Sequence, residues 1–308
     1  MSKSLCELLL QFYPMISEFE DLQSTYVANC VFSSFLCYSA IMLNIVTIHA
    51  IRKTSSLPKT LKTLLLSLAV SDVGVGLLGQ PFYISLLVMW LQQNDPGCNT
   101  YKGFVIILLL FTLASFLGVL AVSVDRFLAI HLHLRYQELV THKRVVAVVI
   151  FIWVLSVFFS LMILWVPFDV GCVFVLILGV LGLLVTVGVY IRIYLVARRH
   201  KNQIAQGQRF AQTEETANLT NVVKSAVVIF YVFFLFLICY LPSFIFLAVY
   251  QIYGPSIPLK RVLLFSWTLF YLNSSLNPLI YCWKMTHIRY AILNILRNMS
   301  WRRNGAFN

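Results

Sequence analysis

Charged residues are scarce in this sequence: only 11% of its 308 residues are Asp, Glu, Lys or Arg, and 60% are hydrophobic. Soluble domains carry roughly 25% charged residues, so the polar surface is too small to cover a water-soluble globule of this size. This excludes a cytosolic enzyme, a disordered regulator and a secreted disulfide scaffold. The apolar runs are long and continuous, unlike the short alternating segments of a membrane β-barrel. The composition therefore predicts an all-α membrane protein.

Seven stretches are almost free of charged residues, and each is longer than the ~20 residues that a spanning helix needs. They cover residues 22–51, 63–94, 103–124, 145–168, 170–191, 225–259 and 262–283, and only Asp72 interrupts them. We therefore predict a seven-transmembrane helix bundle over residues 25–284, after a short N-terminus over 1–24. The tail over 285–308 begins with an amphipathic surface helix, one face of which carries Ile288, Ile292, Ile295 and Leu296.

Lysine and arginine are distributed unevenly between the two sides of this predicted bundle. The side of the N-terminus holds only Lys3, Lys102, Lys260 and Arg261, and the other side holds the remaining 19 of the 23 basic residues (23 − 4). Basic residues concentrate on the cytoplasmic side of membrane proteins. We therefore expect a multi-pass protein of the plasma membrane with an extracellular N-terminus. Its formal charge of +12 then faces acidic membrane lipids rather than a nucleic acid.

Asp72 lies within an apolar stretch, where an ionisable group is unfavourable unless it has partners inside the bundle. Asn44, Ser115, Asn273 and Asn277 are polar residues of other spans that can supply such partners. A carboxylate surrounded by hydroxyls and amides is suited to a small cation, Na⁺ or H⁺, because its ligands are oxygens. The alternative is a satisfied polar network that only holds the helices in register.

Three further features lie inside the spans or at their ends. Asp125, Arg126 and Phe127 follow one another at the end of the third span, where the arginine either neutralises its neighbour or moves to another helix as a switch. Pro242 in the sixth span and Pro278 in the seventh each remove a backbone hydrogen bond and can kink their helices. Such bends allow one end of a helix to move, although transporters also use broken helices.

Taken in order along the chain, these residues resemble those of the rhodopsin-like (class A) G-protein-coupled receptors, and the resemblance covers about the whole chain. Each motif is weak by itself, but their order on successive spans is specific. The matching residues are Asn44 in the first span, Leu68–Asp72 in the second, Ser115 and Asp125–Phe127 in the third, Trp153 in the fourth, Tyr190 in the fifth, Cys239–Pro242 in the sixth and Asn277–Tyr281 in the seventh.

The resemblance implies an activation mechanism for these residues. Arg126 would leave Asp125 on activation and meet Tyr190 and Tyr281 in the inner half of the bundle. Pro242 would let the inner end of the sixth span swing outwards, which opens a cleft for the α-subunit of a heterotrimeric G protein.

The resemblance also implies an ion site and a contact with the G protein. Asp72, Ser115, Asn273 and Asn277 would form the sodium pocket of the family, which favours the resting state, and no other cofactor is expected. Leu134, in the loop after the third span, would insert into a hydrophobic pocket of the G protein.

Four residues depart from the pattern of the family. Phe127 replaces a tyrosine, and Tyr240 replaces the tryptophan that acts as a toggle in the sixth span. Gly182 stands where most members have a proline, so the usual bulge of the fifth span is in doubt. Val222 stands where an acidic residue often pairs with the arginine, so this ionic lock is missing and we expect raised basal activity.

The seven cysteines fit no metal-binding spacing. Most members of the family tie the third span to the second extracellular loop by a disulfide. Tyr101 stands at the usual cysteine position here, and a bridge between Cys98, about one turn earlier, and Cys172 is one candidate pairing. A very short loop is predicted over 167–171. Together these features resemble the branch of melanocortin, lysophospholipid, cannabinoid and adenosine receptors.

Alignment with the motifs of the family places uncharged residues around the expected ligand pocket. Leu108 replaces the aspartate that aminergic receptors need, which argues strongly against a protonated monoamine. Tyr271 replaces the lysine of opsins, which excludes a retinal pigment. Leu247 stands where adenosine receptors have an asparagine. A neutral, largely apolar small ligand fits best. The pocket residues are Phe82, Tyr83, Leu108, Thr112, Phe174, Tyr240, Ser243, Phe244, Leu247, Trp267 and Tyr271.

Other functions remain as alternatives. A peptide that uses the acidic residues Glu18, Glu20 and Asp21 is one, and a receptor that is active without a ligand is another. A seven-span ion or proton carrier using Asp72 belongs to a different class, but the sequence has no internal repeat and no second carboxylate within a span away from the arginine. An intramembrane enzyme would need paired carboxylates, a Ser/His pair or a metal cluster within the bilayer. His49 is the only histidine well inside a span, so this function is excluded.

Overall fold

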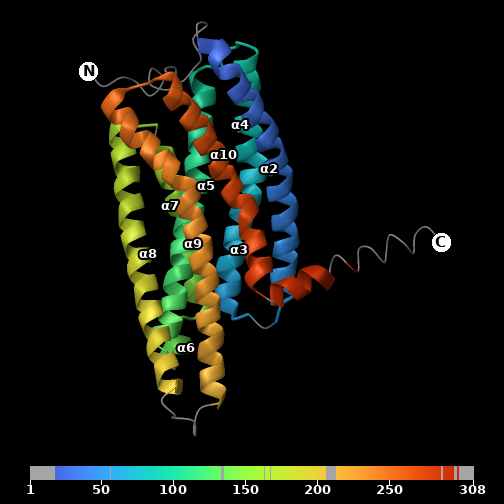
Figure 1. Cartoon of the computed structure of the whole chain (residues 1–308), viewed down its shortest axis with the longest axis vertical. Helices are drawn as coiled ribbons and strands as arrows, with labels where there is room; N and C mark the ends of the chain where they lie inside the picture. The colour runs from blue at the N-terminus through green and yellow to red at the C-terminus, as the bar shows by residue number, and fades with distance from the viewer. Residues whose placement is uncertain are drawn as a thin grey trace, which may run out of the picture.

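The fold is a bundle of long helices, seen in a computed structural model that describes residues 18–55, 57–132, 135–162, 164–166, 168–205, 213–285, 287–294 and 297. Seven helical spans lie side by side (Figure 1). No strand occurs within the described ranges, which agrees with the predicted all-α class. The elements are α2 (Phe19–Lys53), α3 (Lys59–Gly74), the π-helix η2 (Val75–Gly79), α4 (Gln80–Leu91), α5 (Cys98–Leu132), α6 (Tyr136–Leu139), α7 (His142–Met162), α8 (Phe168–Ala205), α9 (Thr213–Tyr253) and α10 (Ile257–Lys284).

Six of the spans are long and apolar enough to cross a membrane by length and composition. The seventh, α10, has 28 residues and packs along α2 and α9. Its polar residues Asn273, Ser274 and Asn277 lower its apolar content, but all three are buried, so they face other helices rather than lipid. The prediction of a seven-helix bundle is therefore confirmed. We call the end of the bundle at which α2 begins, at the top of Figure 1, the upper end.

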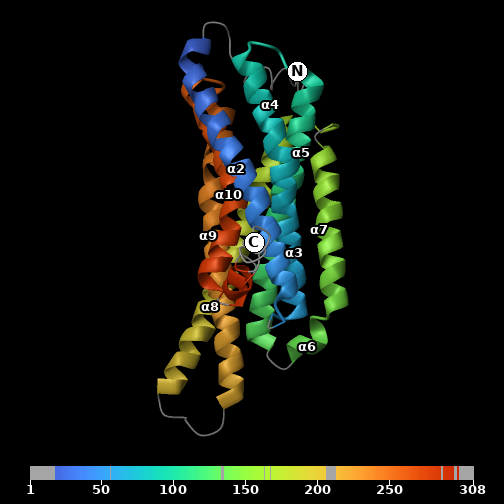
Figure 2. The same ribbon diagram turned by 90° about the vertical axis from the view of Figure 1, so that its right-hand side faces the viewer.

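The helices α8 and α9 continue beyond the predicted apolar stretches, which end at 191 and resume at 225. The helix α8 runs to Ala205, and α9 already begins at Thr213. Both therefore extend past the other helices at the lower end of the bundle (Figure 2). An apolar window detects only the part of a helix that faces lipid, whereas the added turns are polar and continue by helix propensity.

The connection between the fourth and fifth spans lies earlier than predicted. The helix α7 ends at Met162 and α8 begins at Phe168, so the predicted loop over 167–171 is wrong for residues 168–171, which are helical. Asp169 falls in the first turn of α8, and a carboxylate is favourable there because it complements the helix dipole. The acidic residue that indicated a loop therefore marks the start of a helix.

The second span is one continuous crossing with a widened turn in its middle. Residues Val75–Gly79 form the π-helix η2, and Gln80 N–H donates to the carbonyl of Val75. Pro81 follows at the start of α4 and has no N–H to give, so the hydrogen-bonding pattern shifts at this point. Gly76 lies against α2, because an ideal Cβ on it would be 2.7 Å from Cγ1 of Ile41.

The tail begins with a helix, described over residues 287–294. Met285 and Ile288 are buried in an apolar cluster at the lower end of the bundle that also contains Leu61 and Tyr281. Ile292 packs against this cluster. Ile295 and Leu296 of the predicted apolar face lie outside the described residues. The described part of the face therefore covers the lower end of the bundle.

Cys98 at the start of α5 is disulfide-bonded. Cys30, Cys37, Cys239 and Cys282 are free, so none of these four is its partner. The side chain of Cys172 lies outside those described, and its pairing with Cys98 stays a prediction.

The ring of Phe116 leaves no room for a side chain at position 182 of α8. An ideal Cβ on Gly182 would lie 2.0 Å from Cζ of Phe116, far inside van der Waals contact. Phe116 of α5 therefore fills the space that a larger residue would occupy on α8. The helix α8 is continuous through this point.

We predict that Gly182→Ala destabilises the purified protein by about 1–3 kcal/mol, because the new methyl group overpacks against Phe116. Thermal unfolding measures this change. Phe116→Leu in the same chain should restore part of the loss by making room. The control is Gly188→Ala, because nothing lies within 4 Å of a Cβ there. A Gly182→Ala protein that is as stable as the Gly188→Ala protein contradicts the prediction.

Candidate functional site

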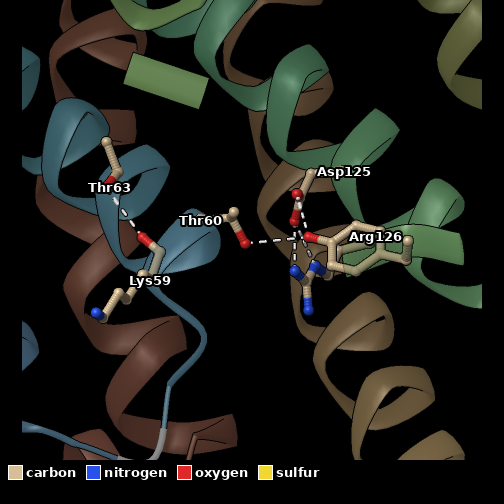
Figure 3. Close-up of polar contacts among 6 residues, drawn as sticks. Lys59, Thr60, Thr63, Asp125 and Arg126 are labelled. Carbon is tan, nitrogen blue, oxygen red and sulfur yellow. Dashed lines mark hydrogen bonds and ion pairs between the residues drawn. The ribbon is translucent and has the colours of Figure 1, made fainter. Parts of the chain in front are cut away.

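A buried ion pair lies at the lower end of α5. Arg126 donates from Nε to Oδ2 of Asp125 at 2.9 Å, and its Nη2 pairs with the same oxygen (Figure 3). The two side chains are only 2% and 4% exposed. The arginine is thus held by its own neighbour in the chain.

The second carboxylate oxygen of Asp125 is held from outside the span. The Tyr136 hydroxyl donates to Oδ1 of Asp125 at 2.7 Å and lies 3.0 Å from the Thr60 hydroxyl. Tyr136 belongs to the short helix α6, and Thr60 belongs to α3, from which it points toward the pair (Figure 3). We call Asp125, Arg126, Tyr136 and Thr60 the lower clamp. It ties α5, α6 and α3 together.

Tyr136 remains a hydrogen-bond donor over a wide pH range. Burial, with the nearby Asp125 carboxylate as the next cause, raises its pKa from 10.0 to about 12. Because the neutral phenol is the form favoured in the folded protein, its contribution to stability is complete below pH 10. That contribution is lost only as the pH rises toward 12.

Sequence reasoning missed Tyr136 and Thr60 as parts of this site. No pattern places the short loop helix α6 beneath α5, and a single threonine near the start of a span is common. Only the contact between the two elements identifies them.

The two tyrosines expected to receive Arg126 are buried at the same end. The Tyr190 hydroxyl lies 3.2 Å from that of Ser123, and its ring packs 5.0 Å from Phe230. The Tyr281 hydroxyl is buried without a hydrogen-bond partner. Pro242 lies inside α9 and Pro278 inside α10. Leu134 and the side chain of Val222 lie outside those described.

Asp72 is buried in the middle of the bundle. Nδ2 of Asn277 on α10 donates to its Oδ2 at 2.9 Å. Ser115 on α5 lies 3.2 Å from Ser71, the residue before Asp72. Asn44 on α2 donates to the carbonyl of Ser274 at 2.9 Å. Four spans therefore meet around this carboxylate.

Several oxygens of this polar core have no hydrogen-bond partner. They are Oδ1 of Asn44, Asp72, Asn273 and Asn277, and each belongs to a residue that is at most 2% exposed. Carboxylate and amide oxygens are the ligands that hard cations prefer. The donor set thus fits a small cation.

Aromatic rings fill the upper end of the bundle between α4, α5 and α10. The ring of Tyr83 lies 5.5 Å from Trp267 and 5.3 Å from Tyr271. Phe104 lies 5.0 Å from Trp267 and 5.9 Å from Tyr83. We call these four residues the upper aromatic cluster. Phe104 was not among the predicted pocket residues, because a phenylalanine in an apolar run carries no signal of its own.

The structure gathers most, but not all, of the predicted pocket residues. Phe82, Leu108, Tyr240 and Phe244 join the same apolar cluster as Tyr83, Trp267 and Tyr271. Thr112 donates to the carbonyl of Leu108 on its own helix. Leu247 packs instead with the neighbouring group around Phe246. Phe174 packs on Phe159 of α7 and is 37% exposed, away from this cluster.

The acidic residues before the first span are engaged with α10. Lys260 pairs with Glu18, and Arg261 donates to the carbonyl of Asp21 at 2.7 Å. These contacts hold the start of α2 against the start of α10. The carboxylate of Glu18 is thus already used within the chain.

Comparisons with known proteins point to one family. The model described as "7 transmembrane receptor (rhodopsin family)" matches residues 43–169 and 166–281. Adenosine receptor A2b of Gallus gallus is 27% identical, with 89% of this chain and 89% of that receptor covered. Adenosine receptor A2a of Homo sapiens is 28% identical, with 87% and 72% covered. Adenosine receptor A3 of Ovis aries is 27% identical, with 84% and 86% covered.

We predict that Tyr136→Phe raises the basal signal several-fold in transfected cells at equal surface expression. The change removes a hydrogen bond to a charged group, worth about 1.5–3 kcal/mol, from an arrangement that holds Arg126 in place. Thr60→Val should have a smaller effect, because it removes only a neutral partner of Tyr136. Thr63→Val is the matched control, since the Thr63 hydroxyl bonds the carbonyl of Lys59 (Figure 3) and lies 3.2 Å from Nε2 of His142, and neither contact involves Asp125. An unchanged basal signal for Tyr136→Phe speaks against a resting role of the clamp.

Proposed function

Since this chain belongs to the rhodopsin family of seven-transmembrane receptors, we propose that it couples a neutral, largely apolar small ligand to a heterotrimeric G protein. Membership of this family makes it a multi-pass membrane receptor and not an enzyme. The finer parts of the proposal concern the ligand, the moving helix, the ion and the orientation.

The upper aromatic cluster is the observation that carries the choice of ligand. Tyr83, Phe104, Trp267 and Tyr271 offer rings but no charge, and the two phenol groups already donate to the carbonyls of Leu264 and Gly79. An apolar or aromatic ligand gains from stacking on such rings, whereas an ammonium or carboxylate ligand would be desolvated without a counter-charge. The ligand reaches this cluster from outside the cell or from the membrane.

A purine nucleoside is the second candidate. The relatives most relevant to it are the adenosine receptors of Gallus gallus and Homo sapiens, which are similar over most of the chain. Leu247 argues against this ligand, because an apolar side chain cannot replace the asparagine that the resemblance places at that position. A peptide ligand is less favoured, because Glu18 is paired with Lys260.

Signal transfer would start from the lower clamp. When the clamp opens, Arg126 leaves Asp125 and reaches the buried hydroxyls of Tyr190 and Tyr281. The lower end of α9 swings outwards about Pro242, and the G protein enters with Leu134 as one contact. This places the lower end in the cytosol and the N-terminus outside, in agreement with the distribution of lysine and arginine.

The polar core around Asp72 would bind Na⁺ in the resting receptor. Asp72, Asn273 and Asn277 each have an unpaired side-chain oxygen that could bind the ion. The Ser115 hydroxyl contacts the hydroxyl of Ser71, the residue before Asp72. A carrier that moves ions through the membrane is the less favoured function, because the chain belongs to a receptor family.

The decisive test of the receptor function is a screen of second messengers (cAMP, Ca²⁺ and inositol phosphate) in transfected cells with lipid, nucleoside and peptide libraries. We expect a response to neutral apolar compounds that Arg126→Ala abolishes while surface expression is kept. A response to nucleosides alone selects the second candidate. A ligand response that survives Arg126→Ala contradicts the coupling mechanism.

Sodium binding is tested without a ligand. We predict that NaCl raises the unfolding temperature of the purified receptor more than KCl at equal ionic strength, because Na⁺ binds only the folded state. The difference should vanish in Asp72→Asn. Ser34→Ala serves as the control, because the Ser34 hydroxyl bonds its own helix on the exposed face of α2. Equal shifts in Na⁺ and K⁺ would falsify the sodium site.

A further inference from the structure

Gln80 and Ser33 are fully buried polar residues that lack partners. Both side chains are 0% exposed. Nε2 and Oε1 of Gln80 and Oγ of Ser33 have no hydrogen-bond partner. Almost all buried polar atoms in folded proteins are hydrogen-bonded to protein or to ordered water, because an unpaired one is unfavourable. None of the functions proposed above uses either residue.

Both residues belong to the contact between α2 and the second span, which a hydrogen bond locates. The Cys37 thiol of α2 donates to the carbonyl of Gly76 at 3.1 Å, so these two positions touch. The helices run antiparallel, as their colours in Figure 2 show. Ser33 lies one turn above Cys37, and Gln80 lies one turn above Gly76. Ser33 and Gln80 are therefore assigned to the layer of the interface above the Cys37–Gly76 contact.

The helix α10 closes the third side of this layer. The Tyr271 hydroxyl donates at 3.2 Å to the carbonyl of Gly79, the residue before Gln80. One turn above Ser33, Thr268 donates to the side-chain oxygen of Asn29. The helix α10 thus contacts both α2 and the second span close to the two unpaired side chains in the sequence.

We propose that Gln80 and Ser33 together bind an ordered water between α2, α4 and α10. Water donates and accepts, so one molecule can satisfy the amide of Gln80 and the hydroxyl of Ser33 at once. The π-helix η2 ends at Gly79, and a widened turn of this kind frequently accompanies a binding or functional site. The site is separate from Asp72, and the inference does not depend on the identity of the ligand.

The first test is a thermodynamic cycle on the purified full-length receptor without ligand. Gln80→Met and Ser33→Ala should each lower the unfolding temperature by roughly 2–4 °C, and the double variant should lose little more than one of them, because both remove the same water. Ser34→Ala, on the exposed face of α2, should leave it unchanged. If Gln80→Met raises the unfolding temperature, or the two losses add, the site holds no shared water and the proposal is overturned.

The second test separates a water from a direct bond between the two side chains, which would also make the losses non-additive. Hydroxyl radicals generated by X-ray pulses label side chains beside tightly bound water even where bulk solvent is absent. Tyr271 is 0% exposed, so its labelling reports an internal water. We expect labelling in the wild-type chain that falls to background in the double variant. Background labelling in the wild-type chain overturns the proposal.

Discussion

Polar groups that enter apolar helices have to find partners on other helices, and four such contacts join α2 to α10. In a membrane, no solvent is available to satisfy such groups. The contacts run from the upper end to the middle of the bundle. They are the Lys260–Glu18 pair, the Thr268–Asn29 hydrogen bond, the bond from Ser275 to the carbonyl of Leu36, and the bond from Asn44 to the carbonyl of Ser274. The first and last spans are thereby fixed to each other.

The upper aromatic cluster continues downwards as a column of rings. Phe116 lies 5.6 Å from Phe236, which stacks on Tyr240 at 3.8 Å. Tyr240 meets Phe270 at 5.2 Å, and Phe270 lies 5.1 Å from Tyr271 of the cluster. The departures from the family pattern at Gly182 and Tyr240 belong to this column, because Phe116 occupies the space beside the glycine. The column thereby joins α5, α9 and α10 through ring contacts.

The sequence was sufficient for the bundle and for the presence of a polar core, because long apolar runs and a single buried acid are strong signals. It named Asn277 as a partner that the seventh span can supply to Asp72, and the structure brings the two together. It could not predict Tyr136, Thr60 or Gln80. The roles of Tyr136 and Thr60 depend on the position of α6 below α5. The position of Gln80 depends on the π-helix η2 that precedes it. Neither feature produces a periodic pattern in the sequence. Asp169 led to the wrong prediction of a loop, because acidic residues are favourable both in loops and in the first turn of a helix.

The length of α9 below its proline has a mechanical consequence. Twenty-nine residues separate Pro242 from Thr213, where α9 begins, and at 1.5 Å per residue this segment is roughly 44 Å long. A pivot of only about 5° at the proline would carry the tip of such a lever through roughly 4 Å. In the proposed motion, a change smaller than one bond length beside Tyr240 would therefore be enlarged several-fold at the lower tip of α9.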